Sequence, residues 1–226
     1  MKELLFIVNP VAGHGRSLRV FGRLRAVLDQ VAGLRSVIWT TRGPGHAAEL
    51  AEQAGLEGYE RIVAVGGDGT VHEAINGLMA LKPQLRERVA FGVVPAGSGN
   101  DFARNVGIPT DPGALAALLA SGPASPVDIG AVNGHYFANV AGVGFDAEVA
   151  RLANRLPEYV PGPLTYVVSA LSVLASYKNA AVRIHLDGQV VDRRVLLVAV
   201  GNGAGYAGGM IICPGAKMND GRFRVV

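Results

Sequence analysis

The stretch RIVAVGGDGTVHEAINGL, residues 61–78, holds the features that decide the fold. Residues 61–65 predict a buried strand, because a short apolar run that ends in glycine is typical of a parallel sheet. GGDGT (66–70) follows as a glycine-rich loop, and residues 71–81 continue with a helical pattern that stops before Pro83. A strand that passes through such a loop into a helix predicts a βαβ unit, and it raises the question of what the loop holds.

The same alternation runs through the first half of the chain. We expect strands at residues 3–8, 36–40, 61–65 and 89–95, and helices at 17–31, 46–55, 71–81 and 113–120. Strands that alternate with helices in this way predict a parallel, doubly wound sheet of the α/β class. Such sheets bind ligands at the carboxyl ends of their strands, so the loops after these strands are the first candidates for a site.

The pattern changes at SGPASPVD (121–128), which is rich in serine, proline and glycine. We therefore expect a domain boundary here, with an α/β domain at 1–124 and a β-rich domain at 125–226. Strand-like segments of the second domain lie at 127–132, 135–144, 181–191 and 193–202, and LDGQV (186–190) predicts a hairpin turn. GVGFDA (142–147) has part of a dinucleotide-binding fingerprint but lacks the downstream acidic residue, so it is interpreted as a turn.

One apolar helix is expected in the second domain, at residues 164–177. It is interpreted as part of the core, with contact to a bilayer or to a lipid cleft as the alternative. Its longest apolar stretch, 164–175, is shorter than the roughly 20 residues that a membrane-spanning helix needs. No secretory signal precedes the first strand, and Cys213 as the only cysteine excludes an internal disulfide. These features favour a cytoplasmic protein.

The composition is that of a globular protein rather than a disordered one, with 50% hydrophobic and 17% charged residues among 226. The net charge is +3, and several arginines lie between positions 16 and 25. This basic excess is compatible with anionic partners such as nucleotides or membrane lipids. A solvated helix face is the simpler explanation of it.

Three strand ends carry glycine-rich loops: NPVAGHGR (9–16), GGDGT (66–70) and PAGSGNDFAR (95–104). In a parallel sheet they open on one edge, where glycines let backbone N–H groups approach an anion and a following helix adds a favourable dipole. Thr70 and Ser98 can cap a helix or bond a phosphate oxygen. Asp68 would repel a lone anion, so its carboxylate predicts a cation, as in Mg²⁺-nucleotide chemistry. Each loop alone could be an ordinary strand–helix turn, but three at one edge favour a phosphate site.

GGDGT together with PAGSGNDFAR resembles the diacylglycerol kinase catalytic domain family, which includes bacterial lipid kinases and the sphingosine and ceramide kinases. NPVAGHGR is similar to the opening nucleotide loop of that family, and GNGAGYAGGMIICPGAKMNDG (201–221) is similar to its later glycine-rich segment and turn. The resemblance covers the whole chain. It implies a nucleotide-binding α/β domain of the NAD kinase and diacylglycerol kinase type, followed by an antiparallel β domain that is incomplete at its C-terminus.

The resemblance also implies which residues bind the nucleotide and the metal. Asp68 would organise Mg²⁺ and its waters, and Asp220 with the carbonyl groups of Lys217 and Arg222 would bind a second, structural Mg²⁺. A simple Asp-Gly turn is the alternative for Asp220. The implied nucleotide-binding residues are Asn9, Gly13, Thr41, Gly66, Gly67, Asp68, Gly69, Thr70, Val71, His72, Ser98, Asn100 and Asp101, of which Asn100 and Asp101 would brace the second loop.

The implied reaction is transfer of the γ-phosphate of ATP to the hydroxyl group of a lipid similar to diacylglycerol. ATP and Mg²⁺ are the expected cofactors, and the expected partner is a lipid at the inner membrane face, to which the protein would bind peripherally. A nucleic-acid partner is not expected, and the resemblance leaves a homodimer open.

The sequence departs from the family near its end. The chain stops in the strand-like GRFRVV (221–226), before the later Asp-Gly-Glu segment that supplies the family's general base. Asp187 in LDGQV comes too early to be that base. We therefore expect a shortened chain that binds ATP but is a weak or silent catalyst. The alternatives are an NAD kinase-like enzyme, which GSGNDFAR (97–104) argues against, and a non-catalytic ATP-binding regulatory module.

Overall fold

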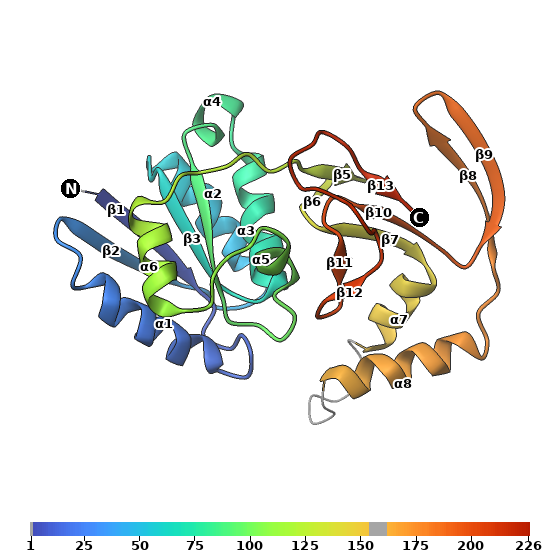
Figure 1. Ribbon diagram of the computed structural model, residues 1–226, viewed down its shortest axis with the longest axis horizontal. Helices are drawn as coiled ribbons and strands as arrows, with labels where there is room; N and C mark the ends of the chain where they lie inside the picture. Colours follow the sequence, from blue (N-terminus) through green and yellow to red (C-terminus); the bar gives the residue numbers. More distant parts are fainter. Residues whose placement is uncertain (1, 154–161) are drawn as a thin grey trace.

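A four-stranded parallel sheet forms the centre of the first part of the molecule. The computed structural model describes residues 2–153 and 162–226 (Figure 1). The strand order is β2-β1-β3-β4, so the order of the chain reverses between β1 and β3. The strands are β1 (Lys2–Val8), β2 (Leu34–Thr40), β3 (Arg61–Gly66) and β4 (Ala90–Pro95). All four were expected from the sequence, and the prediction of a doubly wound α/β sheet is confirmed.

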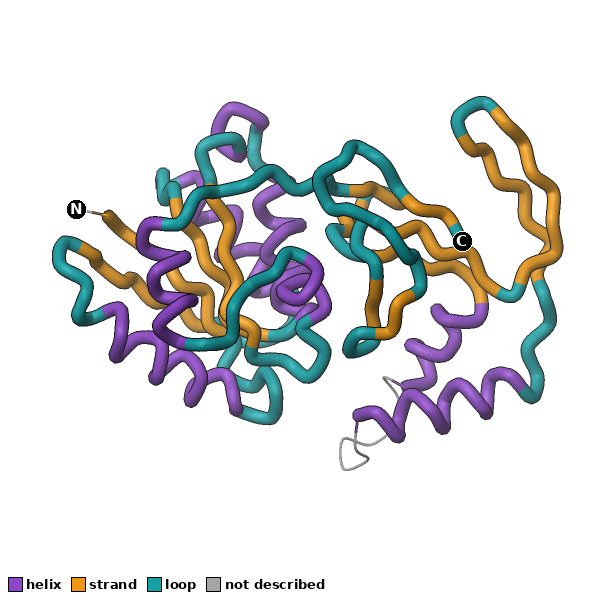
Figure 2. The backbone as a smooth tube through the Cα atoms, in the orientation of Figure 1, coloured by secondary structure: helices purple, strands orange, loops and turns teal. Residues whose placement is uncertain are grey.

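Helices cover both faces of this sheet (Figures 1 and 2). Alternate residues of β1 point to opposite faces, so Leu4, Phe6 and Val8 pack on one side while Leu5 and Ile7 pack on the other. The helices of the first face are α1 (Arg16–Leu28) and α6 (Pro112–Ser121), and those of the second are α2 (His46–Leu56) and α3 (Asp68–Ala80). Two buried clusters therefore hold the carboxyl edge of the sheet in place.

Around the parallel sheet, the helix boundaries differ from the predictions by three residues at two places. Helix α1 ends at Leu28 rather than at residue 31, because the chain turns there toward Gly33, whose φ is +76°. Helix α3 begins at Asp68 rather than at residue 71, so the second half of GGDGT forms its first turn. Two short helices were not predicted: α4 (Pro83–Arg86) and α5 (Asp101–Asn105).

The second part consists of short antiparallel strands. Residues 135–144 form two strands rather than one, because the chain bends between them at Ala138 and Asn139. The hairpin at LDGQV is confirmed: Asp187 and Gly188 both have positive φ, as a two-residue turn of type I′ requires. The strands are β5 (Gly130–Val132), β6 (His135–Phe137), β7 (Val140–Gly144), β8 (Ala180–Leu186), β9 (Gln189–Val195), β10 (Leu197–Gly201), β11 (Gly205–Tyr206), β12 (Met210–Ile211) and β13 (Arg224–Val225).

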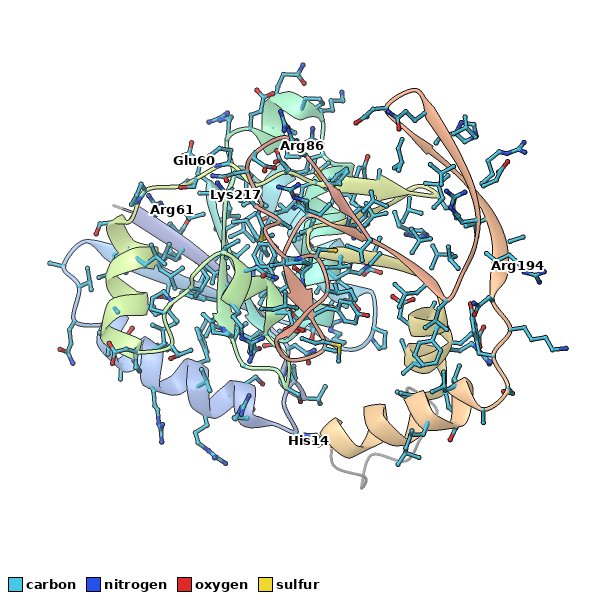
Figure 3. The ribbon with its side chains drawn as sticks, turned by 45° about the vertical axis from the view of Figure 1, so that its right-hand side comes forward. His14, Glu60, Arg61, Arg86, Arg194 and Lys217 are labelled. Atoms are coloured by element: carbon cyan, nitrogen blue, oxygen red, sulfur yellow. The ribbon has the colours of Figure 1, made fainter. Side chains whose placement is uncertain are left out.

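These strands pair in small groups. The largest is a three-stranded antiparallel sheet with the order β13-β10-β7, and the other pairs are β5-β6, β8-β9 and β11-β12. The β8–β9 hairpin projects from the rest of the chain in Figures 1 and 2, and Figure 3 shows Arg194 at its outer edge. The predicted antiparallel β region after the α/β sheet is thus confirmed.

Two predictions about the helices of this region were wrong. GVGFDA is not a turn between strands: β7 ends at Gly144 and helix α7 (Phe145–Ala153) begins at the next residue. The part of the apolar helix α8 (Gly162–Leu174) whose side chains are described, residues 168–174, is not core: Val168, Leu171 and Leu174 are 42%, 64% and 56% exposed, and Ser169 is buried. Across the described part of the chain, no helix combines the length and the apolar character needed to cross a membrane.

Asp146, in the first turn of α7, should make the free energy of unfolding depend on pH. Burial raises the pKa of its carboxyl above the ordinary value of 3.8, although the Ala147 N–H donates to Oδ1 at 2.9 Å. Between the two pKa values the folded chain binds more protons than the unfolded chain, so the free energy of unfolding falls as pH rises through this range. Asp146→Asn keeps the acceptor for Ala147 and removes this titration. We expect its stability advantage over wild type to grow as pH rises above 3.8 and then to become constant.

Urea unfolding at a series of pH values between 3 and 7 measures this difference, with Glu87→Gln as a control that removes an exposed carboxylate. A stability difference between Asp146→Asn and wild type that does not change with pH would contradict the prediction.

Hydrogen bonds join the two parts across large sequence separations. The Asn76 side chain of α3 donates to the Tyr136 carbonyl and accepts from the Tyr136 N–H, both at 2.9 Å. The Asp101 carboxylate accepts from the Gly208 N–H at 2.9 Å. These bonds place the β region against α3 and α5, next to the carboxyl edge of the parallel sheet.

Asn76 is the most direct test of this junction. We expect Asn76→Ala to lower the free energy of unfolding by about 2 kcal/mol, because it leaves the N–H and C=O groups of Tyr136 without their partner. Chemical denaturation measures the loss. Gln53→Ala is the matched control, since the Gln53 side chain bonds to Glu57 on the exposed face of α2. A loss at Asn76 no larger than that of the control would show that the junction does not depend on this side chain.

Candidate functional site

A cavity of about 410 Å³ lies at the carboxyl edge of the parallel sheet. The segments that follow β1, β2, β3 and β4 all contribute to its walls. Its position includes the reversal point between β1 and β3, where open α/β sheets bind their ligands. The lining residues are Asn9, Pro10, Val11, Ala12, Gly13, Thr41, Arg42, Gly43, Pro44, Ala47, Gly67, Gly69, Thr70, Glu73, Gly97 and Ser98.

The loops around the cavity meet backbone to backbone. A Cβ atom on Gly97 would lie 2.3 Å from the Cα atom of Gly67, and one on Gly13 would lie 2.2 Å from the carbonyl oxygen of Ala96. Gly13 also has a φ of +58°, which side chains disfavour. Only glycine allows the three loops to come this close, so the glycines are needed to assemble the site and not only to form turns.

The first loop is fixed to the start of α3. The Asn9 side chain donates to Thr70 Oγ1 at 3.0 Å and accepts from the Val11 N–H at 3.2 Å. Its backbone carbonyl accepts from Ser17 Oγ at 2.6 Å. Asn9, Thr70 and Ser17 therefore hold the loop after β1 against the loop after β3.

Helix α3 presents its N-terminus at the cavity. Its N-cap is Gly67, in an extended conformation, and no side chain caps the helix. The first N–H groups of a helix have no acceptor within the helix, and the helix dipole favours negative charge at this end. Gly67, Gly69 and Thr70 all line the cavity, so this end of it is suited to an anionic group such as phosphate.

The loop after β4 is held by its own side chains. Asn100 has a positive φ of 56° and bonds both the N–H and the C=O of Gly97, at 2.8 and 2.9 Å. The Arg16 guanidinium also donates to the Gly97 carbonyl. The Phe102 N–H donates to Asp68 Oδ1 at 3.0 Å, which ties the start of α5 to the first turn of α3.

Asp101 connects this loop to the β region. Its carboxylate is 8% exposed, forms an ion pair with Arg104 at 2.6 Å and accepts from the Gly208 N–H. A buried carboxylate is costly unless it is paired and hydrogen-bonded, and Asp101 has both kinds of partner. It therefore supports the loop rather than facing the cavity.

The cavity brings together seven of the residues predicted to bind the nucleotide. These are Asn9, Gly13, Thr41, Gly67, Gly69, Thr70 and Ser98. Gly66, Asp68, Val71, His72, Asn100 and Asp101 do not line it. Both Val71 and His72 belong to α3: Val71 is buried in the core, whereas His72 is exposed. The backbone N–H of Thr41 donates to the Val8 carbonyl at 2.9 Å, which fixes Thr41 beside the end of β1.

One wall of the cavity and one acidic side chain were not predicted from the sequence. Arg42, Gly43, Pro44 and Ala47 follow β2 and form that wall. The signal was available, because β2 ends at the same edge as the other strands. Glu73 lies on α3 one turn after Gly69, and this i, i+4 spacing places both residues on one face of the helix.

The predicted second metal site lies in a turn that does not line the cavity. Asp220 Oδ1 accepts from the Arg222 N–H at 3.1 Å, as in an Asp-Gly turn, and Lys217 (labelled in Figure 3) precedes it. A second carboxylate, Asp128, lies at this turn and was not predicted to do so from the sequence. Its Oδ2 atom accepts from the Gly221 N–H at 2.7 Å, and its own N–H donates to the Met218 carbonyl. A metal at this turn stays a prediction.

The residues around Asp68 fit a magnesium ion. Asp68 Oδ2 lies 2.7 Å from where a Cβ atom on Gly99 would be, whereas Asp101 Oδ2, at 3.1 Å from that point, already accepts from the Gly208 N–H. Of the hydrogen bonds and ion pairs described here, Asp68 uses only Oδ1. In residues 2–153 and 162–226 no cluster of three or more His, Cys, Asp or Glu side chains could hold a metal. Mg²⁺ in nucleotide sites typically takes one or two carboxylates and completes its shell with phosphate oxygens and water.

Two family models match the chain. The diacylglycerol kinase catalytic domain matches residues 3–132, and the YegS C-terminal NAD kinase beta sandwich-like domain matches residues 139–226. Together they cover both parts of the structure, in the same order.

Relatives of known name agree with these matches. The chain is 34% identical over 224 residues to a diacylglycerol kinase of Bacillus subtilis. This match covers 99% of the chain and 72% of the relative. It is 33% identical over 226 residues to a diacylglycerol kinase of Staphylococcus carnosus, covering 100% of the chain and 72% of the relative. A crystal structure of a diacylglycerol kinase from Bacillus anthracis superposes with a TM-score of 0.72 at 30% identity, covering 99% of the chain and 72% of that structure.

Proposed function

The chain belongs to the diacylglycerol kinase family and is a lipid kinase, and from this premise we propose that it transfers the γ-phosphate of ATP to the hydroxyl group of diacylglycerol. Diacylglycerol is the acceptor that the names of its relatives state. A kinase of this family uses ATP as the phosphate donor.

The observation that carries the proposal is the cavity at the carboxyl edge of the sheet. Its walls combine the uncapped N-terminus of α3 with three glycine loops that touch backbone to backbone. This arrangement provides many N–H groups and little negative charge, which suits a polyphosphate. The apolar residues Pro10, Val11, Pro44 and Ala47 line the same cavity and suit a sugar and a base.

We assign the predicted residues two kinds of role within this site. Asn9, Gly13, Thr41, Gly67, Gly69, Thr70 and Ser98 would contact the nucleotide directly, because they line the cavity. Gly66, Val71, Asn100 and Asp101 would shape it from behind, through the packing and hydrogen bonds of the loops. His72 is exposed. We keep it among the nucleotide-binding residues only because it belongs to the N-terminal segment of α3.

Asp68 has a separate role in the proposal. Its Oδ1 atom holds the Phe102 N–H, and its Oδ2 atom would hold Mg²⁺ through water. When bound, Mg²⁺ neutralises the charge that develops on the phosphate oxygens during transfer. The loops position the terminal phosphate in line with the lipid hydroxyl, and the helix N-terminus stabilises the phosphates electrostatically. For the turn at 217–222 we keep the predicted structural Mg²⁺, with Asp220 and the carbonyls of Lys217 and Arg222 as its ligands.

A lipid acceptor requires access to a membrane surface. We propose peripheral association, with α8 as the contacting element, because Val168, Leu171 and Leu174 form an exposed apolar stripe on it. We propose that residues 1–124 bind the nucleotide and that residues 125–226 bind the lipid and the structural metal. A homodimer also stays a prediction, and sedimentation of the chain in the absence of lipid tests it.

Two measurements on the purified 226-residue chain test the proposal. The first is thermal unfolding with Mg²⁺ and ATP, where a ligand at 100 times its Kd should add about 2.7 kcal/mol of stability. The second is transfer of labelled phosphate from ATP to dioleoylglycerol in phosphatidylglycerol vesicles. We expect stabilisation by ATP and only slow labelling of the diacylglycerol.

Vesicles without diacylglycerol and a reaction with NAD in place of lipid are the controls. Labelled NAD would favour the NAD kinase-like alternative, and stabilisation by ATP without any labelling would favour a non-catalytic module. Absence of stabilisation by ATP would reject the nucleotide site itself.

A further inference from the structure

We propose that His46 positions the wall of the cavity that follows β2, and that ATP therefore binds less tightly when its imidazole carries a proton. Residues of this wall line the cavity from Thr41 to Pro44 and at Ala47, whereas the half-buried His46 does not. His46 is thus a positioning residue, because it acts through the backbone of the wall. The inference rests on the proposed nucleotide site and adds a dependence on pH to it.

Both ends of this wall are anchored to neighbouring elements. At one end the Thr41 N–H donates to the Val8 carbonyl of β1 at 2.9 Å. At the other end, in the first turn of α2, the Ala47 N–H donates to Glu73 of α3 at 3.2 Å. The position of residues 42–45, between the two anchors, has to be set locally.

A side chain closes the turn between the anchors. Pro44 has no N–H group and Gly45 has a φ of +83°, so the chain turns sharply before α2 begins at His46. The Arg42 N–H donates to Nδ1 of His46 at 3.0 Å, and the His46 N–H donates back to the Gly43 carbonyl at 3.3 Å. The imidazole therefore closes a ring of five residues, three of which line the cavity.

The bond from Arg42 requires a neutral imidazole. Nδ1 can accept a hydrogen bond only while it carries no hydrogen, so the bond assigns the proton of neutral His46 to Nε2. Histidine takes up a second proton within the range of about pH 5 to 8, and Nδ1 then becomes a donor. Two donors cannot bond each other, so the turn loses the bond that closes it and the wall is released.

Charged groups on three elements act on this imidazole. Arg42 in the wall and the N-terminus of α2 disfavour a second proton, whereas Glu49 of α2 and Glu73 of α3 favour it. None of these groups replaces the acceptor that the Arg42 N–H loses. Bound phosphates would also favour a charged imidazole, and that attraction alone would make ATP bind more tightly at low pH. Release of the wall predicts the opposite sign.

The test measures the Kd of ATP with Mg²⁺ by calorimetric titration between about pH 5.5 and 8. Three chains are compared: wild type, His46→Asn and His46→Ala. The Oδ1 atom of asparagine replaces Nδ1 as the acceptor and does not titrate. Protonation of ATP itself affects all three chains equally, so the ratio of the wild-type Kd to the His46→Asn Kd isolates the imidazole.

At pH 8 we expect this ratio to be about one, and His46→Ala to bind ATP about 3- to 10-fold more weakly than both, the range of one hydrogen bond. As pH falls to 5.5, the ratio should rise toward the same factor, because wild type comes to resemble His46→Ala. His185→Asn is the matched control, since His185 is an exposed histidine on the β8–β9 hairpin. It should keep the wild-type pH profile.

Four results would overturn the inference. They are a ratio that stays at one across the pH range, a wild-type chain that binds ATP more tightly than His46→Asn at low pH, His46→Ala with the wild-type Kd at pH 8, and His46→Asn as weak as His46→Ala at pH 8. The last result would assign the effect to packing of the ring. A wild-type chain that binds no ATP at pH 8 rejects the proposed nucleotide site itself, so the two failures are distinguishable.

Discussion

Asp68→Asn should lower Mg²⁺-dependent phosphate transfer by about 10²- to 10³-fold while the chain stays folded. The substitution removes the negative charge that we assign to Mg²⁺, but it keeps an oxygen for the Phe102 N–H. The structural link between α3 and α5 therefore survives, and the loss reports on the charge. The measurement is the rate of diacylglycerol labelling at saturating ATP.

The matched control for Asp68 is Asp29→Asn. Asp29 is an exposed carboxylate at the end of α1, paired with Arg25 at 3.7 Å, and its loss should change the rate less than twofold. Excess Mg²⁺ should restore part of the Asp68→Asn activity if the charge acts through the metal. An Asp68→Asn variant with the wild-type rate would remove Asp68 from the mechanism.

Gly97→Ala should abolish detectable ATP binding. The new Cβ atom would lie 2.3 Å from the Cα atom of Gly67, and this Cα atom belongs to backbone that cannot move aside without opening the cavity. The two loops must then separate, which removes the N–H groups of one loop from the phosphates. We also expect a loss of about 2–4 kcal/mol in the free energy of unfolding. Titration with ATP and urea unfolding measure the two effects.

Gly22→Ala is the control for Gly97. Gly22 lies within α1, is exposed and has no atom within 4 Å of where its Cβ would be. Alanine there should stabilise the helix by up to about 1 kcal/mol. ATP binding to Gly97→Ala at the wild-type Kd would show that the contact between Gly67 and Gly97 is not needed to form the site.

The sequence predicted the parallel sheet because its signals are local. Each strand is a short apolar run, and each strand end carries glycines whose positions decide how closely the loops can approach. The predicted start of α3, residue 71, lies three residues after the observed start at Asp68. The reason is that Gly67 and Gly69 have low helix propensity and the sequence offers no capping side chain there. Tertiary contacts overcome that propensity: Asn9 bonds Thr70, and Asp68 bonds the start of α5.

The remaining differences come from information that is not local. The apolar sequence of α8 predicts a core helix. Whether other elements pack against α8 depends on the rest of the fold, and the structure leaves Leu171 exposed. Glu73 looks like any glutamate on an amphipathic helix until the wall after β2 is placed beside it. Asp128 and the turn at 217–222 are about 90 residues apart in the chain, and only the folded structure shows the bond between Asp128 and Gly221, with a separation of 93.

The bonds between the two parts have a consequence for the order of folding. Asn76 and Tyr136 are 60 residues apart, and Asp101 and Gly208 are 107 apart, so these contacts close very long loops. The β1–β4 sheet forms from segments that are mostly neighbours along the chain, and its loop-closure entropy is correspondingly smaller. A ribosome would release residues 1–121 before Gly208 exists, so the sheet can form while synthesis continues. Pulsed hydrogen exchange should therefore protect amides of β1 and β3 before those of β7 and β10, and simultaneous protection would contradict this order.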